Sequence, residues 1–224
     1  MSQPEVVNPT FSMARLLDVR TRTWAAVRAI AERIHVGMAQ HEADVTAREV
    51  LRSLGLGSGW HRVIVRLGHN TVLPYATASA PEIVLGDDDI FFIDIGPIFD
   101  GYEGDGGDTF VVGDNPEHHR LRRDVKEVWN EVRALWFAEQ ATGQELYEYA
   151  KSAAAQRDWV LNLDLAGHRL AEFPHKALSP GTLAAFELPP KPNLWVLEIS
   201  LLDPQGSVGA FYEDLLLADQ ISDP

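Results

Sequence analysis

The hydrophobic pattern along the chain predicts four helices. Apolar residues recur at intervals of three or four in the segments 13–34, 43–54, 118–140 and 142–157. This interval matches the period of an amphipathic helix, which packs one face against a core. The fourth segment opens with Thr142 and has Glu145 three residues later, the signature of an N-terminal capping box.

Between and after these helices the pattern becomes strand-like. Val63, Val65 and Leu67 alternate with other residues, as in a half-buried strand. Short apolar runs of the kind found in buried strands occupy the segments 90–96, 193–203 and 208–219.

The order of these elements predicts the organisation of the chain. Two helices followed by a hairpin occur twice, and no linker-like stretch separates the two copies. We therefore expect a single domain of α+β class over residues 12–224. Residues 1–11 are polar and contain two prolines, so we expect them to form a flexible N-terminal arm.

Composition narrows the class of protein. The formal net charge of −14 argues against a nucleic-acid partner, because phosphate contacts need clustered Lys and Arg. The chain contains no cysteine, so disulfides and thiolate metal sites are excluded. The first residues show no signal-peptide pattern, and no apolar run approaches the roughly 20 residues of a membrane span. We therefore expect a cytoplasmic protein with no membrane partner.

The first predicted hairpin is rich in carboxylates. Residues 93–110 read IDIGPIFDGYEGDGGDTF, and the Asp-Gly pair at 100–101 predicts a two-residue turn. This turn would make Asp94 and Asp105 diagonal neighbours on one face, roughly 7–8 Å apart at the backbone. Because an unpaired buried carboxylate is costly, the cluster is either a solvated turn or a site for a positive group.

The second predicted hairpin repeats this arrangement. A four-residue turn with the sequence PQGS sets Glu198 opposite Glu213, roughly 4.5–5.5 Å apart on one face. Both glutamates stand in apolar strands, so the pair calls for a cation or a shared proton. His168 follows the strand-like segment 159–167 in a Gly-His context. One acidic hairpin alone is as often an exposed edge, but two together with a histidine favour a metal site.

These residues, taken in chain order, resemble the metal ligands of the methionine aminopeptidase, prolidase and creatinase family, the pita-bread metallohydrolases. The five matching residues are Asp94 in IDIG, Asp105 in GYEGD, His168 in AGH, Glu198 in VLEIS and Glu213 in YED. His175, seven residues after His168, also has a counterpart in the family. The resemblance covers the chain from the first helix and is to the catalytic domain alone. It implies the pita-bread fold, an α+β fold with a pseudo-twofold antiparallel sheet covered by helices.

The resemblance also implies a mechanism. Two divalent ions, either Mn²⁺, Co²⁺, Fe²⁺ or Zn²⁺, would be bound by the five residues, with Asp105 and Glu213 bridging them. Asp94 would complete the shell of one ion, and His168 and Glu198 that of the other. A metal-bound hydroxide would attack a carbonyl, with Glu198 as general base and His175 hydrogen-bonded to the developing oxyanion.

Some positions depart from the family pattern. Tyr75 stands where the family has a histidine in an LPH context. A tyrosine can donate a hydrogen bond, but with an ordinary pKa of roughly 10 it is a poor proton shuttle. We include Tyr75 among the catalytic residues. His61 and His69 are alternative replacements for the missing histidine, although we expect each to be an ordinary loop residue.

Two arginines of the family pattern are also replaced. Asp108 stands in place of the arginine after the second ligand, and Phe211 with Tyr212 in place of the one before the last ligand. The second arginine usually supports the site or a substrate carboxylate. Its replacement argues against the C-terminus of a dipeptide as the recognised feature.

The resemblance predicts a dinuclear metal-dependent hydrolase that cleaves a C–N amide bond, as an aminopeptidase or an Xaa-Pro dipeptidase-like enzyme. The alternative is a creatinase-like hydrolase of a small non-peptide substrate. A third hypothesis is a catalytically silent binding module, although such modules lose metal ligands and this chain keeps all five. The expected partners are a small peptide or small-molecule substrate and, because family members are often dimers, a second copy of the chain.

Overall fold

The computed structural model describes residues 5–175 and 181–217. Its helices are α1 (Met13–Ala31), α2 (Gln40–Ser53), α3 (Pro116–Glu139) and α4 (Gly143–Ala155), with two 3-10 helices, η1 (Gly68–Val72) and η2 (Leu183–Ala185). Its strands are β1 (Ile64–Leu67), β2 (Asp89–Ile95), β3 (Ile98–Phe99), β4 (Tyr102–Glu103), β5 (Gly106–Val112), β6 (Val160–Leu161), β7 (His168–Arg169), β8 (Trp195–Leu202) and β9 (Gly209–Leu215).

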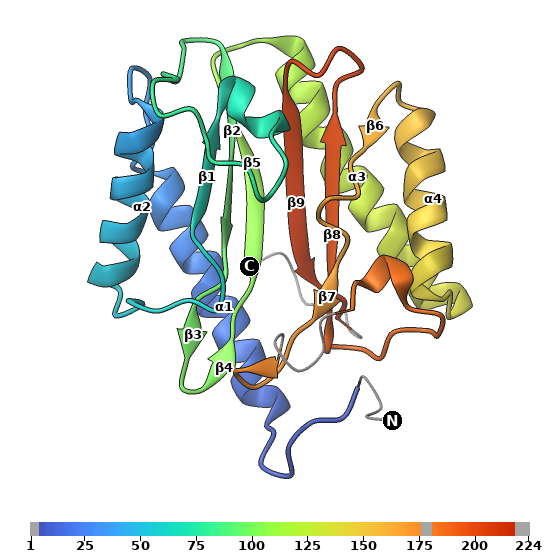
Figure 1. The fold of residues 1–224 in the computed structure, drawn as a ribbon. Helices are drawn as coiled ribbons and strands as arrows, with labels where there is room; N and C mark the ends of the chain where they lie inside the picture. Colours follow the sequence, from blue (N-terminus) through green and yellow to red (C-terminus); the bar gives the residue numbers. More distant parts are fainter. Residues whose placement is uncertain (1–4, 176–180, 218–224) are drawn as a thin grey trace.

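Seven of these strands form one antiparallel sheet (Figure 1). The order across the sheet is β1-β2-β5-β9-β8-β6, and β7 also pairs with β8. The strands β3 and β4 form a short ribbon that extends the β2–β5 hairpin. In one half, α1 and α2 precede β1, β2 and β5; in the other, α3 and α4 precede β6, β8 and β9. This repetition confirms the expected α+β class.

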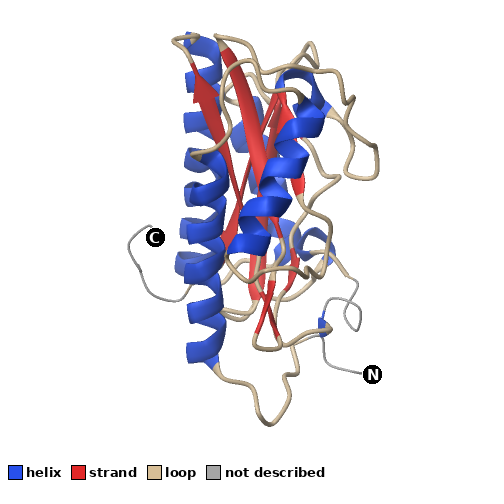
Figure 2. Cartoon of the chain, turned by 90° about the vertical axis from the view of Figure 1, so that its left-hand side faces the viewer, coloured by secondary structure: helices blue, strands red, loops and turns tan. Residues whose placement is uncertain are grey.

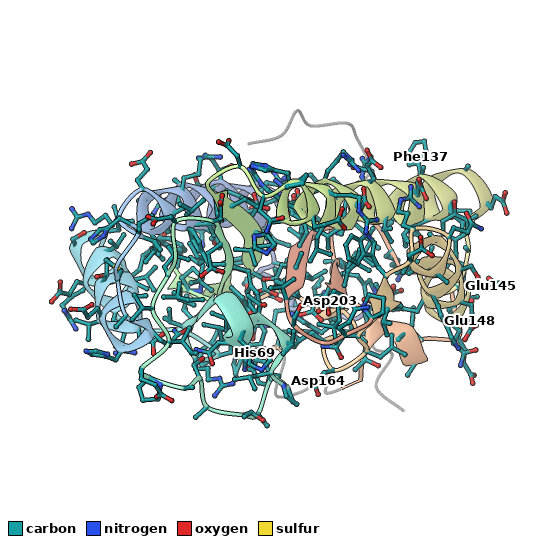
Figure 3. The ribbon with its side chains drawn as sticks, turned by 90° about the horizontal axis from the view of Figure 1, so that it is seen from above. His69, Phe137, Glu145, Glu148, Asp164 and Asp203 are labelled. Atoms are coloured by element: carbon teal, nitrogen blue, oxygen red, sulfur yellow. The ribbon has the colours of Figure 1, made fainter. Side chains whose placement is uncertain are left out.

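The main hydrophobic core lies between the sheet and the two long helices, α1 and α3. Figure 2 shows this layering from the side, and Figure 3 shows both helices along one face of the sheet with loops on the other. Val27 and Ile30 of α1 and Val125 and Val128 of α3 are fully buried in this layer. The shorter helices α2 and α4 pack at the two edges, beside β1 and β6.

The opposite face of the sheet has a second, smaller apolar cluster, formed by Ile64, Phe92 and Phe211 with Tyr75 and Leu165 packed against it. Loop residues cover this face: His69 and Asp164 lie on it in Figure 3, whereas Phe137 projects from α3 on the far side. Side chains two residues apart in a strand share a face. Asp94 therefore points to the loop-covered face with Phe92, and so does Glu213 with Phe211.

Some element ends differ from the sequence-based expectations. The first helix ends at Ala31 rather than residue 34. The backbone N–H groups of Arg33 and Ile34 donate to the carbonyl oxygens three residues earlier, as in a 3-10 turn, and not four residues earlier as in an α-helix. The second helix begins earlier, at Gln40, where Glu42 accepts a hydrogen bond from the Ala39 N–H and closes the first turn.

The strand-like segment 159–167 contributes only the short strand β6. The side chain of Asn162 accepts a hydrogen bond from the backbone N–H of Asp164, so the chain turns instead of continuing along β8.

The described part of the N-terminal segment contacts the domain. Residues 1–4 lie outside the described residues. Glu5 accepts hydrogen bonds from the backbone N–H of Lys191 and the indole N–H of Trp195, and Val7 and Phe11 pack against the core. Within the described ranges, none of the helices combines the length and the hydropathy needed to span a bilayer.

Candidate metal centre

Four residues on four neighbouring strands form one row across the sheet. Asp94 in β2 pairs with Gly107 in β5, and Gly107 pairs in turn with Glu213 in β9. Glu213 pairs with Glu198 in β8, which confirms the register expected from the second turn. A Cβ at position 107 would lie 2.9 Å from Glu213 Oε1 and 2.6 Å from the Phe211 ring. Gly107 therefore leaves space between the carboxylates of Asp94 and Glu213.

Asp105 and His168 approach this row from one side. The Nε2 atom of His168 lies 2.7 Å from Asp105 Oδ2 and 3.9 Å from Glu198 Oε1. The Nδ1 atom lies 2.9 Å from the backbone oxygen of Arg169. A carbonyl oxygen only accepts hydrogen bonds, so Nδ1 carries the proton and Nε2 is the nitrogen that faces the carboxylates.

The Gly-His motif also positions Glu198. The backbone N–H of Gly167 donates a 2.5 Å hydrogen bond to Glu198 Oε2. Gly167 has a φ of 69°, and a Cβ there would lie 2.7 Å from the backbone oxygen of Val196. Glycine therefore allows both the left-handed backbone and the close approach to β8.

His61 is a sixth member of the cluster, and the expectation that it is an ordinary loop histidine is wrong. It lies between α2 and β1, yet only 8% of its side chain is exposed. Its Nε2 atom lies 3.4 Å from Asp94 Oδ1 and 3.3 Å from Asp105 Oδ1.

Hydrogen bonds of the preceding residue, Trp60, hold His61 in place. The backbone N–H of Trp60 donates to the oxygen of Gly96, and its indole N–H donates to the oxygen of Gly104. These contacts join residues that are far apart in the sequence, so no local pattern predicts them. The one sequence feature that could have pointed to His61 is the Trp-His pair directly before β1, which pairs with β2. No tight turn joins these two strands, so the sequence does not show which of their residues lie opposite each other.

Five members of the cluster line a cavity of about 150 Å³: His61, Asp94, Asp105, His168 and Glu198. Trp60, Tyr75, Asp164 and Thr182 complete much of its lining. The guanidinium of Arg62 stacks 4.8 Å from the centre of the Tyr75 ring. Tyr75, which stands where the family has a histidine, therefore lines the same cavity as the carboxylates.

Two of the buried carboxyl groups, those of Asp94 and Glu213, have raised pKa values. The pKa of Asp94 is raised to about 7, mainly by burial; His61 opposes this rise, and the charge of Asp105 reinforces it. Burial also raises the pKa of Glu213 well above its usual range, and repulsion from Asp105 and Asp94 adds to the effect. Both groups would be held ionised more easily by a nearby cation.

Contacts within the cluster shift the pKa values of His61 and Asp105 in opposite directions. Burial alone would lower the pKa of His61, but the charges of Asp94 and Asp105 outweigh burial and raise it to about 9. Burial would likewise raise the pKa of Asp105, but hydrogen bonds and charge from His168 and His61 leave it lowered. Asp105 is therefore the carboxylate that both imidazoles contact.

His175 lies close to this cluster but does not line the cavity as described. It is buried, and among the described residues its Nε2 atom has no hydrogen-bond partner. Burial, together with the charge of Arg169 and the influence of His168, lowers its pKa to about 4. The imidazole is therefore neutral near pH 7.

Asp108 and Tyr212, which replace family arginines together with Phe211, lie away from the cavity, and so does His69. Asp108 pairs with Ile93 across the hairpin and forms a 2.7 Å ion pair with Lys126 of α3, so it faces the helices. Tyr212 likewise packs between Trp24 and Trp129. His69 is exposed and contacts the backbone oxygen of Ser207 through Nδ1.

The donors of this cluster suit divalent cations. Two groups of three residues, His61 with Asp94 and Asp105, and Asp105 with His168 and Glu198, have ligand atoms within 4.8 Å of one another. Glu213 Oε1 is buried and, among the described residues, has no hydrogen-bond partner. An unsatisfied carboxylate oxygen beside the space at Gly107 fits a bound cation, because native proteins rarely leave such an atom unpaired. Oxygen and imidazole donors fit Mn²⁺, Co²⁺, Fe²⁺ and Zn²⁺.

Comparison with protein families gives a match to metallopeptidase family M24 over residues 15–219. Comparison with curated proteins finds no significant match.

Solved structures resemble this fold over most of the chain. The prolidase from Pyrococcus furiosus superposes with a TM-score of 0.70 at 22% identity, covering 91% of this chain and 60% of that one. The X-Pro aminopeptidase from Thermotoga maritima gives 0.68 at 20% identity, with 92% and 58% covered. This chain thus spans about three fifths of the length of those two proteins.

A methionine aminopeptidase from Thermotoga maritima gives a TM-score of 0.72 at 15% identity, with 96% of each chain covered. At these identities the likeness concerns the fold. It confirms the expected pita-bread fold, with its antiparallel sheet covered by helices.

Proposed function

Because this chain belongs to metallopeptidase family M24, we propose that it is a dinuclear metal-dependent hydrolase that cleaves a C–N amide bond. The observation that carries the proposal is the convergence of two acidic hairpins. Asp94 and Glu213 lie in one row with Glu198, and Asp105 contacts His168 beside them. Family membership supports a hydrolase, and the site chemistry supports divalent ions as its cofactors.

The proposed ligands are Asp94, Asp105, His168, Glu198 and Glu213. Asp105 belongs to both groups of closely spaced donors, and Glu213 lies between Asp94 and Glu198 in the row. Both residues would therefore hold the ions at the centre of the ligand set. When bound, the pair of divalent ions supplies positive charge that polarises a carbonyl and makes a water molecule more acidic.

The chain's own residues would move the proton and hold the substrate. Glu198 is oriented by the backbone N–H of Gly167 at one oxygen, which leaves Oε1 toward the cavity to accept a proton from the attacking water. His175 does not line the described cavity, but by its counterpart in the family we assign it the hydrogen bond to a substrate carbonyl oxygen, which a neutral ring can donate. Tyr75 can donate its hydroxyl proton in a hydrogen bond from the cavity wall.

The charge of the cavity favours one substrate end over the other. Outside the proposed metal ligands, its described lining contains one carboxylate, Asp164 at the exposed rim, and no Lys or Arg. Phe211 belongs to the apolar cluster beside the site, so it offers no partner to a substrate carboxylate. A free amino terminus fits this lining better than a free carboxyl terminus. We therefore favour an aminopeptidase over a dipeptidase.

The same observation supports a second candidate, a creatinase-like hydrolase of a small substrate that carries a positive charge. Such a substrate would also match the acidic lining, and it would need no contact with a peptide chain.

The test is a hydrolysis screen with the full chain loaded with Co²⁺ or Mn²⁺. The substrates are Met-Xaa and Xaa-Pro peptides, each with a free and a blocked amino terminus, and a guanidino acid, whose guanidinium group is positively charged. We expect cleavage of peptides with a free amino terminus, and loss of cleavage in Glu198→Gln. Turnover of the guanidino acid alone would favour the second candidate. If the loaded protein turns over none of these substrates, the hydrolase proposal is contradicted.

A further inference from the structure

We propose that His61 is an additional metal ligand, which binds the ion held between Asp94 and Asp105. The inference rests on the proposed metal centre and deepens it: each of the two ions would then have one imidazole ligand. His61 belongs to the loop between α2 and β1, outside the five positions that resemble the family's ligand set.

The first argument is the spacing of the donor atoms. His61 Nε2 lies 3.4 Å from Asp94 Oδ1 and 3.3 Å from Asp105 Oδ1. Around an ion with bonds of about 2.1 Å, neighbouring ligand atoms are roughly 3.0 Å apart in octahedral and 3.4 Å apart in tetrahedral geometry. The imidazole nitrogen therefore stands at the separation expected for an edge of a coordination polyhedron.

The second argument is the tautomer. His61 Nδ1 lies 2.7 Å from the backbone oxygen of Arg62, which can only accept a hydrogen bond. Nδ1 must therefore carry a proton, and in the neutral ring the lone pair is on Nε2, directed at the two carboxylates. Histidine ligands of metals are commonly fixed in this way, by a hydrogen bond from the second ring nitrogen.

The third argument is that His61 and His168 occupy equivalent environments. Each Nδ1 contacts the backbone oxygen of the next residue, at 2.7 Å for His61 and 2.9 Å for His168. Each Nε2 faces a different oxygen of Asp105, Oδ1 for His61 and Oδ2 for His168. The ring of Trp60 packs edge-on against both, with centroid distances of 4.4 Å and 4.9 Å. His61 therefore stands at one oxygen of Asp105 as His168, a proposed ligand, stands at the other.

The fourth argument is that the backbone makes room for this ring. A Cβ at Gly96 would lie 2.0 Å from Cδ2 and 2.2 Å from Nε2 of His61. Any side chain at position 96 would therefore displace the imidazole from Asp94 and Asp105. The approach of His61 depends on a glycine two residues after one of the carboxylates that it contacts.

The direct test counts histidine ligands in the full chain loaded with Co²⁺. Paramagnetic Co²⁺ strongly shifts the proton NMR signal of the ring N–H of each histidine that it binds. We expect two shifted, solvent-exchangeable ring signals in the wild-type protein and one in His61→Gln. We also expect Co²⁺ titration of His61→Gln to show one binding event with an affinity at least about 10-fold lower. Residues that only support a metal ligand typically change the affinity by about 10- to 100-fold when they are replaced, and loss of a ligand should cost no less.

His69→Gln is the matched control. His69 has the same kind of contact from Nδ1 to a backbone oxygen but is exposed outside the site, so its replacement should leave both signals and both affinities unchanged. Gly96→Ala keeps His61 in the chain while displacing its ring, and we expect it to lose the same signal as His61→Gln.

The outcomes separate the inference from the proposed function. Two bound ions with one shifted ring signal in the wild-type protein would overturn the inference while leaving the metal centre intact, because His61 would then only hydrogen-bond to the carboxylates. This test uses the wild-type protein alone, so it can be made even if His61→Gln fails to fold. A wild-type protein that takes up no Co²⁺ would overturn both the inference and the metal centre.

Discussion

Glu198 and Glu213 face each other directly across β8 and β9, and Glu213 Oε1 has no hydrogen-bond partner among the described residues. Both side chains are buried, with residue exposures of 6% and 1%. Like charges in directly opposed positions destabilise a sheet unless something neutralises them. This pair therefore makes the stability of the protein depend on a bound cation or a retained proton.

Replacement of Glu213 should separate folding from metal binding. Burial keeps the pKa of Glu213 well above its usual range, so glutamine resembles the protonated form of the metal-free protein. We expect Glu213→Gln to keep or raise the Tm of the metal-free protein. Wild-type protein with Co²⁺ at about 100 times its Kd should gain about 2.7 kcal/mol, a rise in Tm of roughly 5–10 °C for a chain of this size. The variant should lose this gain.

Differential scanning calorimetry with and without Co²⁺ measures both quantities. Glu148→Gln, on the exposed surface of α4, is the matched control and should respond to Co²⁺ like the wild type. A Glu213→Gln protein that still gains stability from Co²⁺ would show that Glu213 is not a ligand.

As pH rises, the contribution of Asp94 to the stability of the metal-free protein should fall, whereas the affinity of the protein for Co²⁺ should rise. The pKa of Asp94 is raised from 3.8 to about 7 in the folded, metal-free protein. Between these values the folded state holds a proton that the unfolded state has released, so the contribution of Asp94 to stability falls as pH rises through this window. A metal ion binds the ionised carboxylate, so the affinity for Co²⁺ should rise from about pH 6 to about pH 8.

Calorimetric titration with Co²⁺ in buffers of different ionisation enthalpy would measure the protons released. We expect more protons to be released per ion at about pH 6 than at about pH 8, and less of this difference in Asp94→Asn. Equal release in the wild type and in Asp94→Asn would refute a role for this carboxyl group in metal binding.

Tyr75 should affect turnover without affecting metal content. Phenylalanine keeps the ring that packs beside Phe92 and Phe211 and stacks on Arg62, but it removes the hydroxyl group. Loss of a hydrogen bond that strengthens in the transition state should lower kcat by about 10- to 100-fold. Steady-state kinetics on a substrate found in the hydrolysis screen, with metal analysis of the same sample, would measure both effects. An unchanged kcat in Tyr75→Phe would assign Tyr75 to packing alone.

Asp108 should behave as a structural residue, although it replaces an arginine of the family pattern. Its carboxylate pairs with Lys126 on the helix side of the sheet, and the Lys126 side chain is about one third exposed, at 34%. We expect Asp108→Asn to cost about 0.5–1 kcal/mol of unfolding free energy, measured by urea denaturation, and to leave the content of bound Co²⁺ unchanged. Loss of bound Co²⁺ in this variant would mean that the contact between Asp108 and Lys126, on the helix-covered face of the sheet, affects metal binding on the opposite face.

The sequence by itself determined the two hairpins and their carboxylates. The register of each hairpin follows from a local turn: Asp-Gly at 100–101 in one, and the turn that joins Asp203 to Val208 in the other. A two-residue side-chain period then decides which carboxylates share a face. For this reason the relation between Glu198 and Glu213 could be predicted from local chemistry alone.

Tertiary structure decided how the two hairpins meet and which further residues join them. The pairing of Gly107 with Glu213 connects strands about a hundred residues apart in the chain, as their numbers show, and no turn encodes it. The position of His61 depends on the backbone hydrogen bond from Trp60 to Gly96 and on the absence of a side chain at Gly96. Such contacts arise from packing between distant segments, so a sequence pattern that reports local periodicity could not assign His61 to the site.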